Sequence, residues 1–211
     1  RDVAPSRGLG DVYKRQLYNP IEEYLYNTGR WDGKDRIRAL ADLVSCHNPH
    51  WRELFYRWFL GMVAHWRGID KQHGNNTSPL LVGPQGYRKS TFCRILLPPE
   101  LRFGYTDSID FKSKQEAERS LGRFFLINID EFDQINANQQ GFLKHLLQKP
   151  VANLRKPYGS TIQEMRRYAS FIGTSNLKDL LTDPSGSRRF ICIEVTGPIQ
   201  TLSLIHISEP T

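Results

Sequence analysis

The chain has 211 residues, a formal net charge of +7 and 39% hydrophobic residues. This composition is typical of a globular protein, and no apolar run approaches the roughly 20 residues of a membrane span. Three scattered cysteines fit a reducing cytoplasm, so we expect a cytoplasmic protein without a membrane partner. The basic balance favours a polyanionic partner such as nucleic acid; a merely basic surface is the alternative.

Both ends of the chain differ from its body. Residues 1–16 contain Asp-Val-Tyr-Lys-Arg-Gln, and residues 202–211 read Leu-Ser-Leu-Ile-His-Ile-Ser-Glu-Pro-Thr. Both segments resemble translated sequencing-adaptor tails. We therefore interpret them as non-native tails and expect the natural protein to extend beyond both.

Residues 17–68 predict a small helical N-terminal subdomain. A short helix, a turn at Asp32-Gly33 and a second helix from about Asp35 come first. Over 51–67, aromatic and apolar residues recur at spacings of three and four, which predicts an amphipathic helix whose stripe packs in the core rather than stacking on bases. Residues 46–50 lack a second ligand pair at zinc-site spacing and predict a surface loop. The polar residues 69–78 predict a linker loop.

Residues 79–201 predict an α/β domain with a mostly parallel sheet flanked by helices. Apolar runs predict strands at 79–82, 124–129, 168–174 and 189–195, and a short strand within 103–111. Helices are expected after Lys89, over 114–121 and over 137–148. The basic segment 150–168 predicts a hairpin with its tip at 157–159.

A glycine-bearing turn joins the first of these strands to a helix. In such a turn, backbone N–H groups and the helix N-terminus form an anion-binding site. The pattern predicts a phosphate loop in which Lys89 reaches the β- and γ-phosphates of a nucleotide and the Ser90 hydroxyl holds Mg²⁺. A strand-to-helix turn without a ligand is the alternative. The predicted nucleotide-binding residues are Gly83, Pro84, Gln85, Gly86, Tyr87, Arg88, Lys89, Ser90 and Thr91.

Arg88 departs from the phosphate-loop pattern G-x-x-x-x-G-K-[ST]. The second required glycine falls on position 88, whereas Gly86 lies two residues early. Glycine is favoured there because the backbone approaches phosphate closely, sometimes at positive φ, where arginine is costly. Either Arg88 is accommodated, with its guanidinium near the phosphates or in solvent, or the loop is damaged and binds nucleotide poorly.

Further polar residues border the later strands. Asp130 is placed to bind Mg²⁺, and Glu131 to orient and deprotonate an attacking water; a solvated strand end is the alternative. Asn176 can hydrogen-bond the γ-phosphate or that water, or cap a helix. Arg188 and Arg189 can neutralise charge on the transferred phosphoryl group, or are surface charges. We expect loops 83–91, 130–133, 174–176 and 184–189 to meet at the carboxyl edge of the sheet.

The ordered set of motifs resembles the virulence-associated protein E-like family of P-loop ATPases, which is related to superfamily 3 helicases and primase-helicases. The resemblance covers residues 19–197 and implies an AAA+-like, ring-forming ATPase of mobile elements and phages that uses ATP and Mg²⁺ in DNA replication. The motifs that carry it are Asn19-Pro20-Ile21, Trp31-Asp32-Gly33-Lys34-Asp35-Arg36-Ile37, the loop Gly83–Thr91, Phe171-Ile172-Gly173-Thr174-Ser175-Asn176 and Gly186-Ser187-Arg188-Arg189-Phe190.

The resemblance also implies roles for single residues. Lys89 and Ser90 match the Walker A lysine and hydroxyl, and Asp130 and Glu131 match the Walker B pair. Asn176 matches the polar sensor, and Arg188 or Arg189 the arginine that acts on a neighbouring subunit.

For residues 151–159 the resemblance implies a hairpin that touches single-stranded DNA. Arg155 and Lys156 would contact phosphates and Tyr158 would stack on a base, with Arg166 and Arg167 extending the charge. An ordinary basic hairpin is the alternative. The leading hypothesis is a hexameric DNA motor; the others are a nucleotide- or DNA-binding module impaired by Arg88, and an ATPase switch that remodels protein partners.

Overall fold

The structure is a computed structural model that describes residues 19–69, 71–155, 162–177 and 188–201. Its centre is a five-stranded sheet in the order β2-β3-β6-β1-β7, and every pairing in it is parallel. All five strands therefore end at one carboxyl edge, as the predicted α/β fold requires. The strands are β1 (Ser78–Val82), β2 (Tyr105–Thr106), β3 (Leu126–Ile129), β6 (Ser170–Ser175) and β7 (Phe190–Glu194).

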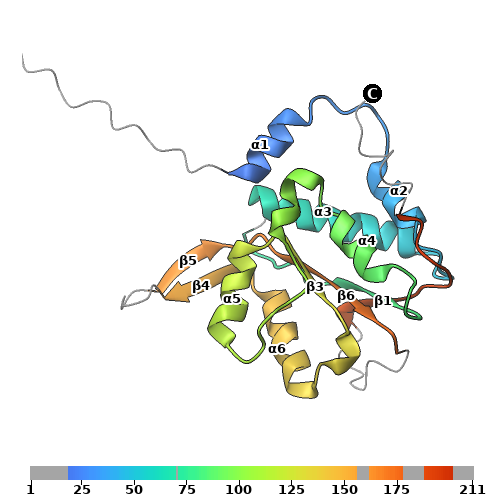
Figure 1. The fold of residues 1–211 in the computed structure, drawn as a ribbon. Helices are drawn as coiled ribbons and strands as arrows, with labels where there is room; N and C mark the ends of the chain where they lie inside the picture. The colour runs from blue at the N-terminus through green and yellow to red at the C-terminus, as the bar shows by residue number, and fades with distance from the viewer. Residues whose placement is uncertain (1–18, 70, 156–161, 178–187, 202–211) are drawn as a thin grey trace, which may run out of the picture.

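Helices cover both faces of the sheet (Figure 1). The helices α3 (Trp51–Arg67) and α4 (Lys89–Ile95) lie on one face, and α5 (Lys114–Arg123) and α6 (Ala137–Gln148) lie on the other. Side chains along each strand alternate between the two layers: Leu81 packs in the first apolar cluster and Leu80 in the second. This alternation buries both faces, which is why the strand sequences read as continuous apolar runs.

The N-terminal helices share an apolar cluster with the sheet. As predicted, α1 (Pro20–Asn27) and α2 (Arg36–Asp42) flank the turn at residues 32–33, and the aromatic stripe of α3 is buried. On that stripe, Phe55 lies 6.1 Å from Phe92 of α4 between ring centroids. The predicted linker is held in the core at Asn75, whose amide donates to the Trp58 carbonyl and to Ser170 Oγ, each at 3.1 Å.

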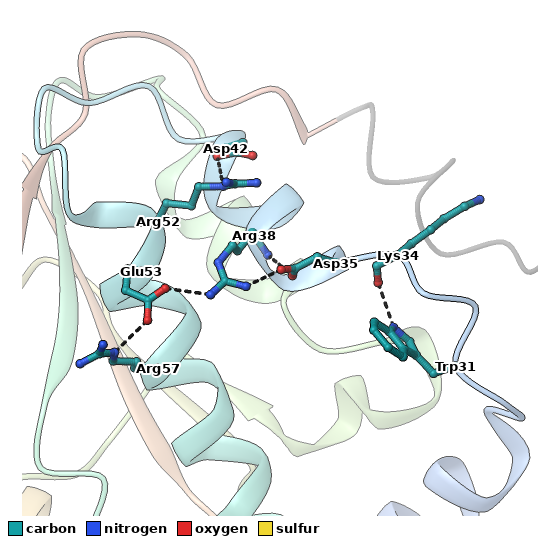
Figure 2. A network of polar contacts seen from close by, with 8 residues as sticks. All are labelled: Trp31, Lys34, Asp35, Arg38, Asp42, Arg52, Glu53 and Arg57. Atoms are coloured by element: carbon teal, nitrogen blue, oxygen red, sulfur yellow. Dashed lines mark hydrogen bonds and ion pairs between the residues drawn. The ribbon is translucent and has the colours of Figure 1, made fainter.

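A polar network joins α2 to α3 (Figure 2). The Asp35 side chain accepts a hydrogen bond from the Arg38 backbone at 3.0 Å and so caps the start of α2. The Arg38 guanidinium donates to Asp35 at 2.5 Å and to Glu53 of α3 at 2.8 Å. Because these side chains lie near solvent, the network orients α2 but stabilises the fold little. Asp35, the charged residue of the Trp31–Ile37 segment in this network, thus has a local structural role.

One predicted strand is shorter than expected, and the predicted hairpin is present. The strand expected within 103–111 has only two residues, because residues before it form the 3-10 helix η1 (Pro99–Gly104). The predicted hairpin is confirmed by β4 (Val151–Arg155) and β5 (Ile162–Arg166), which pair antiparallel in a separate sheet. Its expected tip at 157–159 lies outside the described residues.

Within the described ranges, no helix combines the length and apolar character that a membrane span needs. In the same part of the chain, no three His, Cys, Asp or Glu side chains gather as a metal site, and Cys46 pairs with Val195 in an isolated β-bridge. The 46–50 segment therefore packs against the residues that follow β7.

Candidate nucleotide site

Lys89 opens α4 and lies buried at the carboxyl edge of the sheet, with 6% of its surface exposed. Its amine donates to the carbonyl oxygens of Gly83 and Pro84 at 2.7 and 2.9 Å. A third bond, at 3.1 Å, reaches Asn176 Oδ1 at the end of β6. Burial lowers the pKa of the Lys89 amine, whereas the nearby charge of Asp130 acts in the opposite sense. The amine is therefore a desolvated cation held by acceptors that a phosphate can replace.

The loop between β1 and α4 contains two residues with left-handed backbone, a feature of anion-binding turns. Gly86 has φ 87° and Arg88 has φ 58°, both in the left-handed region. Arg88 thus adopts the conformation that the pattern assigns to glycine, at a cost of about 1–2 kcal/mol. Its side chain is exposed. Of the two predicted outcomes, the backbone conformation matches the first, in which Arg88 is accommodated and its guanidinium lies in solvent. A Cβ on Gly83 would lie 3.0 Å from the Val195 carbonyl, so close packing also favours glycine there.

Asp130 follows β3 and meets two hydroxyls. Ser90 Oγ donates to Asp130 Oδ1 at 2.9 Å, and Thr174 Oγ1 donates to the same oxygen. A carboxylate and a hydroxyl side by side are hard oxygen ligands of the kind that Mg²⁺ takes together with substrate phosphates. Ser90 and Asp130 therefore fit the metal-binding role predicted for them.

Glu131 and Asp133 lie in the turn that leads from β3 into the 3-10 helix η2 (Phe132–Gln134). Glu131 has φ 50°, the only left-handed non-glycine conformation besides Arg88 among the described residues, and its side chain is exposed. The Ser175 hydroxyl, at the end of β6, donates to Asp133 Oδ1 at 2.5 Å. The turn that carries the predicted catalytic base is thus hydrogen-bonded to the strand that carries the predicted sensor.

The structure brings together four of the residues predicted from sequence: Lys89, Ser90, Asp130 and Asn176. The Asn176 side chain accepts from Lys89, which favours the sensor interpretation; the helix that it might cap lies outside the described residues. Sequence reasoning missed three further residues, which are Thr174, Ser175 and Asp133. Two features of the sequence could have indicated them: two adjacent hydroxyl residues at the end of one strand, and a second aspartate in the turn after β3.

Arg188 and Arg189 lie at the opposite edge of the sheet. They precede β7, which runs parallel to β1, and Phe190 pairs with Ser78 at the start of both strands. The Ser78 amide donates to the Arg189 carbonyl at 2.8 Å. The prediction that loop 184–189 joins the carboxyl-edge loops is therefore wrong for its described residues, because residues before a parallel strand lie at its amino end.

Arg166 and Arg167 do not extend a basic surface, so this prediction is also wrong. Arg167 is 2% exposed, and its guanidinium donates to the carbonyls of Leu146 and Leu147, each at 3.0 Å, in the last turn of α6. Burial lowers the pKa of Arg167 to about 10, so the group remains charged at neutral pH. Arg166 donates to the Trp66 carbonyl near the end of α3. Both arginines cap helices instead.

The predicted DNA contacts remain predictions. Arg155 is the last residue of β4, and only its backbone is described. Lys156 and Tyr158 lie outside the described residues.

Comparisons with known proteins bear on the family and the fold. Residues 25–209 match the virulence-associated protein E-like domain. The apo structure of NrS-1 C terminal region (305-718) is 17% identical over 78% of this chain and 39% of that chain, with a TM-score of 0.53. The A form apo structure of the same region is 16% identical over 78% and 38%, also with a TM-score of 0.53. The X-ray structure of JCV helicase is 13% identical over 83% and 49%, with a TM-score of 0.44.

The two NrS-1 structures, with TM-scores of 0.53, show a shared fold. The chain spans less than half the length of each of the three structures. No curated protein matches the chain. The family match covers residues 25–209, most of the sequence, and includes all the motifs on which the resemblance rests except Asn19-Pro20-Ile21. The chain belongs to the virulence-associated protein E-like family.

Proposed function

We propose that this protein is an ATP- and Mg²⁺-dependent motor that acts on single-stranded DNA during replication. One observation carries the proposal: at the carboxyl edge of a parallel sheet, Lys89 donates a hydrogen bond to Asn176, and the adjacent Ser90 donates one to Asp130. In open α/β folds, ligands bind at this edge. Membership of the family supports nucleotide binding over an empty turn.

Each residue of the site has a separate role in phosphate binding, metal binding or hydrolysis. The Lys89 amine exchanges the carbonyls of its own loop for β- and γ-phosphate oxygens, while loop N–H groups bind the remaining phosphate charge. Ser90 and Asp130 would hold Mg²⁺, which when bound supplies positive charge to the phosphates. Glu131 orients the attacking water and takes its proton, and Asn176 hydrogen-bonds the γ-phosphate or that water.

The proposed motor would act as an assembly of several copies. Arg188 and Arg189 lie at the amino edge, so in one chain they are on the far side of the sheet from Lys89. An arginine that stabilises the transferred phosphoryl group would then come from a neighbouring copy, as in a hexameric ring. Within that ring the hairpin residues Arg155, Lys156 and Tyr158 would contact the DNA strand.

The site assignment is tested by DNA-stimulated ATP hydrolysis. Lys89→Ala removes the phosphate-binding amine and Glu131→Gln removes the base, so each should lower turnover by at least about a hundredfold. Lys71→Ala and Glu100→Gln change exposed residues of the same types and serve as matched controls. Unchanged turnover in both site variants refutes the assignment.

The left-handed Arg88 supports a second candidate, a nucleotide- or DNA-binding module with impaired hydrolysis. An arginine side chain at this position can hinder the close approach of phosphate to the backbone. ATP affinity of the natural protein, measured beside Arg88→Gly by calorimetry, separates the two candidates. If only the glycine variant binds ATP, the natural protein is not an ATPase.

A further inference from the structure

The turn from Asp130 to Asp133 is tied at both ends to consecutive residues of β6. Thr174 donates to Asp130, and Ser175 donates to Asp133 at 2.5 Å. Both β6 residues are buried, with 2% and 1% of their surface exposed. Because adjacent side chains of a strand point to opposite faces, the two bonds hold the turn from opposite sides of the sheet.

Glu131 lies between the two tied carboxylates in a conformation that a non-glycine residue rarely adopts. The neighbouring Phe132 is fully buried, 4.9 Å from Phe190 between ring centroids. The Glu131 carbonyl accepts from the Gln134 amide at 2.8 Å. Such a backbone persists only where its surroundings over-determine it, and here every neighbour of Glu131 in the turn is anchored.

We propose that Ser175 and Asp133 are positioning residues that hold Glu131 in its left-handed conformation and keep its carboxylate at the edge where Lys89 lies. The inference rests on the proposed function, since it takes Glu131 as the base that activates water. Thr174 holds the other end of the turn but contacts a predicted metal ligand, so its loss would disturb two roles together. The Ser175–Asp133 bond involves no predicted metal ligand, and Asp133→Ala removes it while leaving the second contact of the Ser175 hydroxyl, which accepts from the Leu177 amide at 3.1 Å, in place.

Turnover gives the first readout. Ser175→Ala should lower kcat for ATP by about tenfold to a hundredfold, the cost of a small misplacement of a catalytic group, with little change in KM. Ser175→Thr keeps the hydroxyl and should restore most of the rate, and Asp133→Asn, which keeps an acceptor oxygen, should be milder than Asp133→Ala. Ser120→Ala removes a hydroxyl on α5 and is the matched control.

Amide hydrogen exchange gives a readout that needs no ATP. The Gln134 and Ile135 amides donate within the turn, to Glu131 and Phe132, so loss of the Ser175–Asp133 bond should speed their exchange in Ser175→Ala but not in Ser120→Ala. If exchange of these two amides is unchanged in Ser175→Ala, the Ser175–Asp133 bond does not stabilise the turn. Faster exchange with unchanged kcat overturns the positioning role. If the wild type does not hydrolyse ATP, the proposed function and the positioning role both fall, while exchange still decides whether the tie exists.

Discussion

The two edges of the central sheet use charged residues in different ways. At the carboxyl edge, Lys89 donates to two carbonyls of its own loop and to the side chain of Asn176, at the end of the neighbouring strand. At the amino edge, Arg166 and Arg167 donate to backbone carbonyls at the ends of two helices. The first arrangement leaves groups that a ligand can engage, whereas the second satisfies the chain's own polar atoms. A lysine or arginine is thus a candidate ligand-binding residue only where a ligand can replace its hydrogen-bond partners.

The largest expected effect concerns the amino edge. Arg167→Leu leaves the carbonyls at the end of α6 without their donor, and we expect it to lower the free energy of unfolding by about 3 kcal/mol in urea titrations. Arg57→Leu is the control, since that side chain is 76% exposed and forms one surface ion pair. Equal losses in both variants would show that the amino-edge arginine has no special structural role.

A smaller effect is expected at the carboxyl edge, where backbone strain accompanies the site. Arg88→Gly relieves the left-handed strain and should stabilise the fold by roughly 0.5–1 kcal/mol. Gly86→Ala should destabilise it by about 1 kcal/mol, because the added Cβ meets open space and only the positive φ opposes it. Thermal unfolding that shifts in the same direction for both would contradict the loop geometry.

The smallest effect is expected in the α2–α3 network, which lies at neither edge. The Arg38 guanidinium lowers the pKa of Glu53, so any stability that this carboxylate contributes is present above its unfolded-state pKa and is lost in acid. Glu53→Gln should leave the unfolding midpoint at neutral pH unchanged within error, because the pair is exposed. A clear decrease in the unfolding midpoint of Glu53→Gln would mean that exposed ion pairs do stabilise this fold.

The sequence was sufficient to predict that Lys89, Ser90, Asp130 and Asn176 meet. Apolar runs that end in polar residues identify parallel strands, and such strands end at one edge. The Ser175–Asp133 bond was beyond such reasoning. Its formation depends on the register between β3 and β6 and on the left-handed turn at Glu131, neither of which a residue pattern encodes.

The errors at the amino edge have a related cause. Arg166 and Arg167 follow a basic hairpin, so composition favoured a continuous charged surface. In the structure, Arg167 instead donates to carbonyls at the end of α6. The sequence around Arg167 does not indicate that these acceptors are near. Arg188 and Arg189 were misplaced because they were assigned by motif order rather than by which end of a parallel strand they occupy.

The helix-capping arginines have a mechanical consequence for the hairpin strands. Arg166 ties β5 to the last turn of α3, and Arg167 ties the next residue to the last turn of α6, on the other face of the sheet (Figure 1). The C-terminal end of β5 is therefore hydrogen-bonded to both helical layers. If either layer tilted, β4 and β5 would be expected to move with it as one rigid unit.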